Sequence, residues 1–267
     1  MLRRILIGLG GSDESRSALE LGLRWAKSHD ALLVGLEIVD KLGMPVGEEA
    51  TSQAGAPELP RSGRPLLEWF ARLCQEAGVD FLVRAAAGTP HLEILAEAQR
   101  HDLIVMGQRS HFDYGLQGAP GETLAKVVQG CPRPVIIVPD TLSTSDVVVV
   151  AYDGSIPAAQ ALYTFGMSGL GVARDVHVVT IGTHALEAAR IAERAIDFLD
   201  AHGIKAEMHP VESALPPAEV ILGRVGQIGA GLLVMGAYGK SVLRELIYGS
   251  VARALLKVCP VPVFVFH

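Results

Sequence analysis

The chain carries the same pattern twice, and this repeat restricts its fold more than any other feature. The segment CPRPVIIVP at 131–139 returns as CPVPVFVFH at 259–267, an offset of 128 residues. The segment LIVMG ending at Gly107 returns as LLVMG ending at Gly236, an offset of 129. A third pair, LGGS and YDGS, lies near the front of each half at an offset of 143. A repeat of this length predicts two similar domains in one chain.

The first half is 14 residues longer than the second upstream of Gly107. The surplus falls in residues 42–63, which are rich in proline and glycine and show no apolar periodicity, so we expect a surface loop there. Residues 140–146 are polar and are the natural linker. We therefore predict domains at 1–142 and 143–267.

Short aliphatic runs alternate with longer amphipathic stretches in both halves, which is typical of strand–helix units and a parallel sheet. The expected strands are 4–9, 32–38, 80–86, 103–107 and 135–138, then 147–152, 176–181, 205–210, 232–236 and 261–266. The expected helices are 14–28, 65–77, 89–100 and 121–129, then 157–170, 184–202, 217–228 and 247–258. The predicted fold class is α/β, with two Rossmann-like domains, each a five-stranded parallel sheet with helices on both faces.

Composition supports this fold and excludes several classes of partner. Hydrophobic residues make up 49% of the chain and charged residues 19%, which suits a buried sheet. The net charge of −6 offers no basic surface for a phosphate backbone, so we expect no nucleic-acid partner. No apolar run approaches the roughly 18 residues of a membrane span. We therefore expect no membrane partner and place the protein in the cytoplasm.

The sequence gives no indication of a metal site or a disulfide framework. The three cysteines, Cys74, Cys131 and Cys259, are far apart and form no C-x-x-C pair, so we interpret them as small buried hydrophobic residues. The nine histidines show no metal-ligand spacing, and we interpret His91, His101 and His111 as surface residues. Serines at the first strand ends, Ser12 and Ser155, are not part of a G-x-S-x-G elbow and are interpreted as helix caps.

In an open parallel sheet, ligands bind beyond the carboxyl ends of the strands, where the winding reverses. In the second half this edge is reached by residues 151–155 and by the loop from Gly236 to Ser250. Asp153 is a suitable acceptor for ribose hydroxyls or an adenine amino group, although it could simply cap the next helix. Glycines in the loop allow close backbone approach, and the start of the last helix offers free amide groups to an anion.

The glycine spacing of this loop resembles a known family. Gly236, two residues, Gly239, nine residues and Gly249-Ser250 match the G-x2-G-x9-G-[S/T] ATP-binding loop of universal stress proteins. The similarity covers nearly the whole chain twice and implies two domains of the adenine nucleotide alpha hydrolase-like fold. It implies ATP, with or without Mg²⁺, as the ligand of the second domain. By position, the binding residues would be Ala151, Tyr152, Asp153, Ile181, Met235, Gly236, Gly239, Gly249, Ser250, Val251 and Ala252. Relatives that bind ATP often have a second hydroxyl where this chain has Ala252.

The first half departs from that pattern at three positions. Gly10 replaces Asp153, Ser110 replaces Gly239, and Glu122 replaces Ser250. The loop is also one residue longer. A carboxylate directed at a triphosphate would repel it. Glu122 could also act as a general base, but we favour its interpretation as a helix-start residue that pairs with the helix dipole. We predict that the first domain does not bind ATP.

The resemblance implies a stress-response ATP-binding regulatory protein that assembles as an intramolecular pseudo-dimer and possesses no dedicated catalytic residues. Strands 135–138 and 261–266 would pair within the chain, and two chains could form a homodimer. Two other functions stay open at this point, namely a slow ATP hydrolase with at most weak activity and an interaction scaffold without a ligand. Lys240 and Arg244 lie inside the loop and either approach the phosphates or face solvent.

Overall fold

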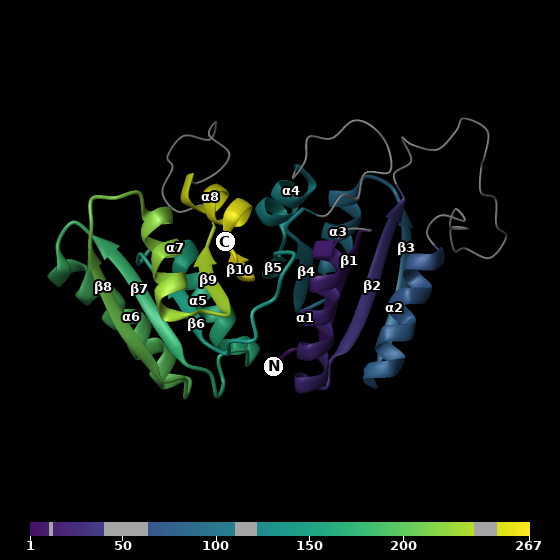
Figure 1. Ribbon diagram of the computed structural model, residues 1–267, viewed down its shortest axis with the longest axis horizontal. Coiled ribbons are helices and arrows are strands. Elements are labelled where there is room, and N and C mark those ends of the chain that lie inside the picture. Colours follow the sequence, from purple (N-terminus) through teal and green to yellow (C-terminus); the bar gives the residue numbers. More distant parts are fainter. Residues whose placement is uncertain (11–12, 40–63, 110–121, 238–249) are drawn as a thin grey trace. The chain divides into compact units, whose positions relative to one another are not determined.

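The computed structural model describes residues 1–10, 13–39, 64–109, 122–237 and 250–267 (Figure 1). Within these residues the chain divides into two compact units, Leu2–Asp140 and Thr141–His267. We refer to them as the N-terminal and C-terminal domains. In the described residues, no helix combines the length and the apolar character needed to cross a bilayer.

The N-terminal domain is a five-stranded parallel sheet of order β3-β2-β1-β4-β5. Its strands are β1 (Arg4–Leu9), β2 (Leu32–Val39), β3 (Phe81–Ala87), β4 (Leu103–Gly107) and β5 (Val135–Val138). Its helices are α1 (Asp13–His29), α2 (Arg64–Ala77), α3 (Pro90–Ala98) and α4 (Glu122–Gly130). Helix α1 packs on β1 and β4 and also contacts α2, whereas α3 packs on β1 and β2 and contacts α4.

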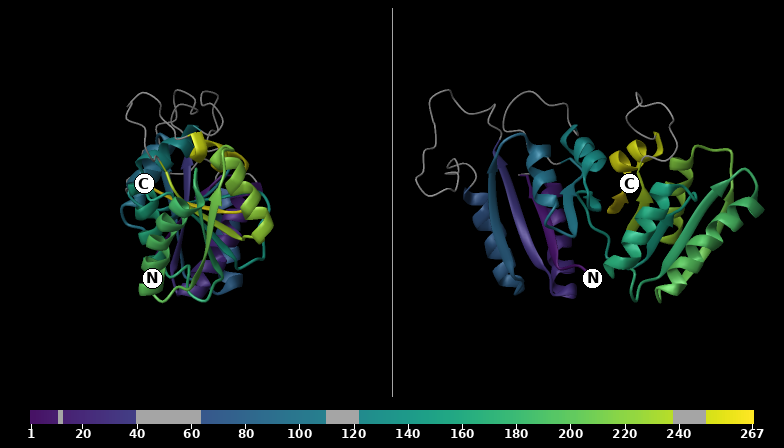
Figure 2. Two further views of the ribbon diagram at one scale, coloured as in Figure 1. Left: turned by 90° about the vertical axis from the view of Figure 1, so that its left-hand side faces the viewer. Right: turned by 180° about the vertical axis from the view of Figure 1, so that it is seen from behind.

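The C-terminal domain repeats this order, as β8-β7-β6-β9-β10, again with all strands parallel. Its strands are β6 (Val148–Ala151), β7 (Val176–Gly182), β8 (Ala206–Glu212), β9 (Leu232–Gly236) and β10 (Val263–Phe266). Its helices are α5 (Ile156–Ser168), α6 (Ala185–Ala201), α7 (Pro217–Ile228) and α8 (Ser250–Val258). Helices α5 and α6 cover one face of this sheet and α7 and α8 the other (Figures 1 and 2).

The predicted fold class is therefore confirmed. Each expected strand is present, and its ends differ from the prediction by no more than two residues. The helices agree equally well, except that residues 247–249 of the last one lie outside the described residues. The predicted loop at 42–63 also lies outside them. The agreement arises because strands buried on both faces must be continuous aliphatic runs, which are easily recognised in sequence.

The core of each domain is aliphatic. Ile5, Leu6 and Ile7 of β1 have no exposed surface, and Val148 and Val149 of β6 have none either. All three cysteines are buried, which confirms their interpretation as small hydrophobic residues. Burial raises the pKa of the Cys74 thiol to about 12 and that of Cys131 to about 11. These thiols are therefore protonated and unreactive at neutral pH.

The strand order creates a topological switch point in each sheet. In the C-terminal domain the chain runs from β6 outward through β7 to β8, and then returns to β9 on the other side of β6. Connections that leave β6 and β9 must therefore depart toward opposite faces of the sheet. The space between the carboxyl ends of β6 and β9 is the topological switch point at which doubly wound sheets bind ligands.

Candidate functional site

The turn after β6 is built by two polar side chains. Oδ1 of Asp153 accepts a hydrogen bond from the amide of Ser155 at 2.9 Å, and Ser155 Oγ accepts one from the amide of Ala158 at 3.3 Å. Ser155 is thus the N-cap of α5, which confirms its predicted capping role. Between them, Gly154 has φ of +73°, a conformation that favours glycine. This turn holds the exposed Asp153 carboxylate at the switch point.

We expect Ser155→Ala to lower the free energy of unfolding by about 1 kcal/mol, because the amide of Ala158 loses its acceptor. Chemical denaturation of the purified chain measures this difference. The control is Thr164→Ala in the same helix, where the hydroxyl bonds to the carbonyl of Gln160 and no cap is removed. Alanine has the higher helix propensity, so this variant should be neutral or slightly more stable. Equal losses in both variants would contradict the capping role.

Tyr152 contributes backbone rather than a free ring to the site. Its side chain is only 8% exposed, and burial raises the pKa of its phenol. The backbone carbonyl of Tyr152 accepts a hydrogen bond from Thr180 Oγ1 at 2.8 Å, and its amide donates to the Val179 carbonyl. The end of β6 is therefore fixed to β7, and Asp153 starts from a rigid position.

Three of the predicted binding residues share one face of the sheet. Ala151 is paired with Met235 on β9 and with Val179 on β7. Ile181 lies two residues beyond Val179, so its side chain points the same way. Ala151 and Ile181 are half-buried and Met235 is 5% exposed. These side chains form an apolar floor on the face that carries α7 and α8.

Gly236 ends β9 on the opposite face. A Cβ atom there would lie 2.4 Å from the amide nitrogen of Ala158 and 2.5 Å from the carbonyl carbon of Pro157. The glycine is therefore required by the close approach of the first turn of α5. The amide of the next residue, Ala237, donates to the Phe266 carbonyl, so the end of β9 is also tied to β10.

The remaining predicted residues follow this strand end. Gly239, Gly249, Lys240 and Arg244 lie outside the described residues. Helix α8 begins at Ser250, so its first backbone amides come from this end of the loop. Val251 is half-buried and Ala252 is 5% exposed. The structure thus places Asp153, the apolar floor and the start of α8 in one domain, and it leaves the middle of the loop unassigned.

The equivalent edge of the N-terminal domain has different chemistry. Gly10 is buried, and its amide donates to Ser15 Oγ at 3.2 Å, so no carboxylate corresponds to Asp153. Glu122 is the first residue of α4 and forms an ion pair with Lys126 at 2.6 Å. This is the helix-start arrangement that we considered as its alternative role. Gly11, Ser12, Ser110 and Gly121 lie outside the described residues.

A buried carboxylate at this edge was not predicted from the sequence. Glu37 of β2 is 1% exposed and pairs in register with Leu9 at the end of β1. Neither of its carboxylate oxygens has a hydrogen-bond partner among the described residues. Burial raises its pKa to about 7. The only signal was a single charged residue within the aliphatic run LLVGLEIV. In the C-terminal domain the corresponding residue is Thr180.

The interpretation of His101 as a surface residue is wrong. Its side chain is 2% exposed, and Nδ1 lies 2.7 Å from the Glu97 carbonyl oxygen. Burial is the main cause that lowers its pKa, so the ring is neutral and can donate to this carbonyl. His101 lies in the connection between α3 and β4, and no apolar periodicity in the sequence indicates that it is buried. His91 is half-buried, and His111 lies outside the described residues.

Comparisons with known proteins agree on one family. The sequence model of the universal stress protein family matches residues 1–139 and 175–267. Universal stress protein Slr1230 of Synechocystis is 31% identical over 169 residues, which are 62% of this chain but only 58% of that relative. Universal stress protein MJ0531 of Methanocaldococcus jannaschii is 28% identical over 52% of this chain and 82% of its own length.

The fold of the whole chain also has a solved counterpart. The crystal structure of a universal stress protein from Archaeoglobus fulgidus superposes with a TM-score of 0.77 and 24% sequence identity. The alignment covers 98% of this chain and 97% of that protein. At this level of identity, the likeness extends to the fold and not to a ligand.

Proposed function

Since this chain belongs to the universal stress protein family, we propose that it is a stress-response regulatory protein whose C-terminal domain binds ATP. The N-terminal domain, in this proposal, has the same fold but no working nucleotide site. The chain would then be an asymmetric tandem in which only the C-terminal domain binds the nucleotide.

The position of Asp153 carries the proposal. One carboxylate oxygen is occupied by the amide of Ser155, which orients the group. No described residue donates to the other oxygen, Oδ2, and the side chain is exposed at the switch point. A fixed carboxylate with one unoccupied oxygen is a good acceptor for ribose hydroxyls. The apolar floor of Ala151, Met235 and Ile181 offers a surface against which an adenine ring can pack.

The phosphates are assigned to the other side of the switch point. Helix α8 begins at Ser250, directly after the glycine-spaced loop that matches the family pattern. The first amides of a helix are free donors, and the helix dipole makes this end positive, so it favours a polyphosphate. The side chain of Ala252 is buried, so we assign only the backbone of this residue to the phosphates.

In its described residues the N-terminal domain differs from the C-terminal domain at two of these elements. Gly10 stands where Asp153 would be and its amide is taken by Ser15. Glu122 places a carboxylate at the start of α4, where the C-terminal domain has Ser250. We therefore keep the prediction that this domain does not bind ATP.

Calorimetric titration of ATP with Mg²⁺ into the nucleotide-free chain tests the proposal. We expect one site per chain. Asp153→Asn keeps the acceptor for the amide of Ser155 but removes the charge, and should weaken binding about 10- to 100-fold, as expected for a lost charge-assisted hydrogen bond. Ser250→Asp adds a negative charge at the start of α8 and should weaken ATP more than adenosine.

Asp200→Asn is the matched control, because Asp200 is an exposed carboxylate on α6 of the same domain. It should leave the titration unchanged. Two sites per chain would show that the N-terminal domain also binds ATP. Absence of heat and of protection against thermal unfolding would favour a scaffold without a ligand. Steady release of ADP that is abolished in the Asp153 variant would favour the alternative function, a slow ATP hydrolase.

A further inference from the structure

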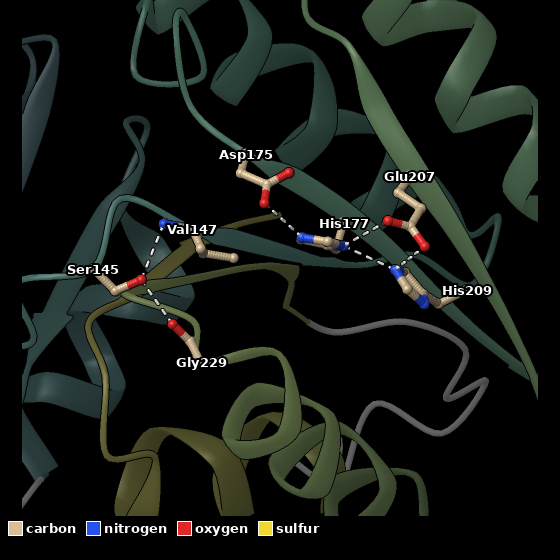
Figure 3. Close-up of polar contacts among 7 residues, drawn as sticks. All are labelled: Ser145, Val147, Asp175, His177, Glu207, His209 and Gly229. Carbon is tan, nitrogen blue, oxygen red and sulfur yellow. Dashed lines mark hydrogen bonds and ion pairs between the residues drawn. The ribbon is translucent and has the colours of Figure 1, made fainter.

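Two histidines and a carboxylate converge on one face of the C-terminal sheet (Figure 3). His177 lies on β7, and Glu207 and His209 lie on the neighbouring strand β8. The register pairs His177 with Glu207. His209 is two residues further along β8, so its side chain points to the same face.

The donor atoms are already close to one another. Nδ1 of His177 lies 2.8 Å from Nε2 of His209. The carboxylate of Glu207 approaches both rings, with Oε2 at 3.8 Å from His177 Nδ1 and Oε1 at 3.5 Å from His209 Nε2. Two ligands on a zinc ion with bonds of about 2.0–2.1 Å lie roughly 3.0–3.4 Å apart. Small side-chain rotations therefore bring all three atoms to coordinating positions.

A fourth residue fixes the orientation of His177. Asp175 precedes β7, and its Oδ2 lies 3.2 Å from Nε2 of His177 (Figure 3). This carboxylate favours the tautomer with its proton on Nε2, which leaves the lone pair of Nδ1 directed at the cluster. Ligating histidines in metal sites characteristically donate their other ring nitrogen to a carboxylate in this way, which fixes the tautomer and strengthens the ligand.

The three side chains of the cluster differ in their exposure to solvent. The side chain of His177 is 11% exposed and that of His209 is 21% exposed, whereas Glu207 is 68% exposed. The imidazoles are therefore held by their surroundings, while the carboxylate side is open to solvent. An ion can enter from this side and keep a water molecule as its fourth ligand.

We propose that His177 Nδ1, His209 Nε2 and the carboxylate of Glu207 form a zinc-binding site, with Asp175 as the residue that orients His177. Two imidazoles and one carboxylate are a ligand set typical of Zn²⁺ in proteins, and the two nitrogen ligands disfavour Mg²⁺ and Ca²⁺. His177 lies near the amino end of β7, whereas the candidate nucleotide site lies at the carboxyl ends, so the two sites are separate.

The site is specific to the C-terminal domain. By the repeat, the N-terminal residue that corresponds to His177 is Val34, which pairs in register with Leu82 on β3. Two residues further along β3 is Arg84, which cannot act as a ligand. The sequence pattern gave no warning of the cluster, because 32 residues separate the two histidines and only the strand register joins them.

Calorimetric titration of ZnCl₂ into the full-length chain, after removal of metal by a chelator, tests this inference. We expect one zinc ion per chain and no heat with Mg²⁺. His209→Ala should abolish binding, and Asp175→Asn should weaken it about 10- to 100-fold, as is usual for partners of metal ligands. His202→Ala is the control, because His202 is exposed at the end of α6 and should leave zinc binding unchanged.

Substitution with Co²⁺ supplies a spectroscopic test that does not depend on stability. A site with two nitrogen ligands and low coordination number should give visible absorption that is absent in His209→Ala. Circular dichroism of each variant verifies that it is folded. Lack of zinc binding by the folded chain would overturn the proposal, as would binding that survives in a folded His177→Ala, His209→Ala double variant. Asp153→Asn should bind zinc normally, which separates this inference from the proposed function.

Discussion

Replacing Gly236 with alanine is expected to lower the free energy of unfolding by about 3 kcal/mol, at the upper end of overpacking costs. The added methyl would lie 2.4 Å from the Ala158 nitrogen and 2.5 and 2.7 Å from the carbonyl carbon and oxygen of Pro157. All three are backbone atoms of the α5 terminus, so no flexible side chain can move aside. Either β9 or the start of α5 must shift, and both border the candidate nucleotide site. Denaturant titration measures the loss.

Gly223→Ala is the matched control. Gly223 lies in the interior of α7 of the same domain, and a Cβ there would meet no atom within 4 Å. Alanine in a helix reduces the entropy of the unfolded chain, so this variant should gain about 0.5–1 kcal/mol. If both variants gained stability, the close approach of β9 to α5 would be refuted. If only Gly236→Ala lost stability but ATP still bound, its glycine would serve packing alone.

The fold was predictable because its strongest determinants are local. Aliphatic runs such as LIVMG and LLVMG are buried on both faces of the sheet, which is typical of central strands in an α/β fold. Their repetition predicted the two-domain organisation, and the DGS sequence after β6 predicted the N-cap of α5. Ser155 does bond to the amide of Ala158, as expected from the residue types alone.

Features that depend on strand register could not be predicted from the sequence. The cluster of His177, Glu207 and His209 exists only because β7 and β8 pair with one particular offset. A shift of β8 by one residue would turn both Glu207 and His209 to the other face. His101 was misplaced for a related reason, since a single polar residue at a helix end carries no period that reveals its burial.

The candidate nucleotide site could be predicted from the sequence only in part. The position of Asp153 at the switch point follows from strand order, and strand order follows from the fold. The packing role of Gly236 did not follow, because the sequence motif presents this glycine only as the first residue of the ATP-binding loop pattern. Contact with α5 makes this residue necessary whether or not a ligand is bound.

Glu37→Gln is expected to stabilise the chain at pH 8 by about 2.5 kcal/mol relative to its effect at pH 5. Burial raises the pKa of Glu37 from 4.5 to about 7 in the folded state. The folded chain therefore binds a proton that the unfolded chain has lost, and stability must fall as pH rises from about 4.5 to about 7. Each pKa unit corresponds to about 1.4 kcal/mol. Glutamine is neutral at every pH, so the stability of the Glu37→Gln variant does not fall in this range for this reason.

Comparing two pH values removes effects of shape, because glutamine and protonated glutamate are nearly the same size. Glu68→Gln, an exposed carboxylate on α2, is the control and should change stability by less than about 0.5 kcal/mol at both values. Glu37→Thr replaces the carboxyl group with the hydroxyl that the C-terminal domain has at the equivalent position. There, Thr180 donates a hydrogen bond to the Tyr152 carbonyl. Glu37→Thr should also remove the pH dependence. A Glu37→Gln effect that is the same at pH 5 and pH 8 would mean that the carboxylate is ionised and paired in the folded chain.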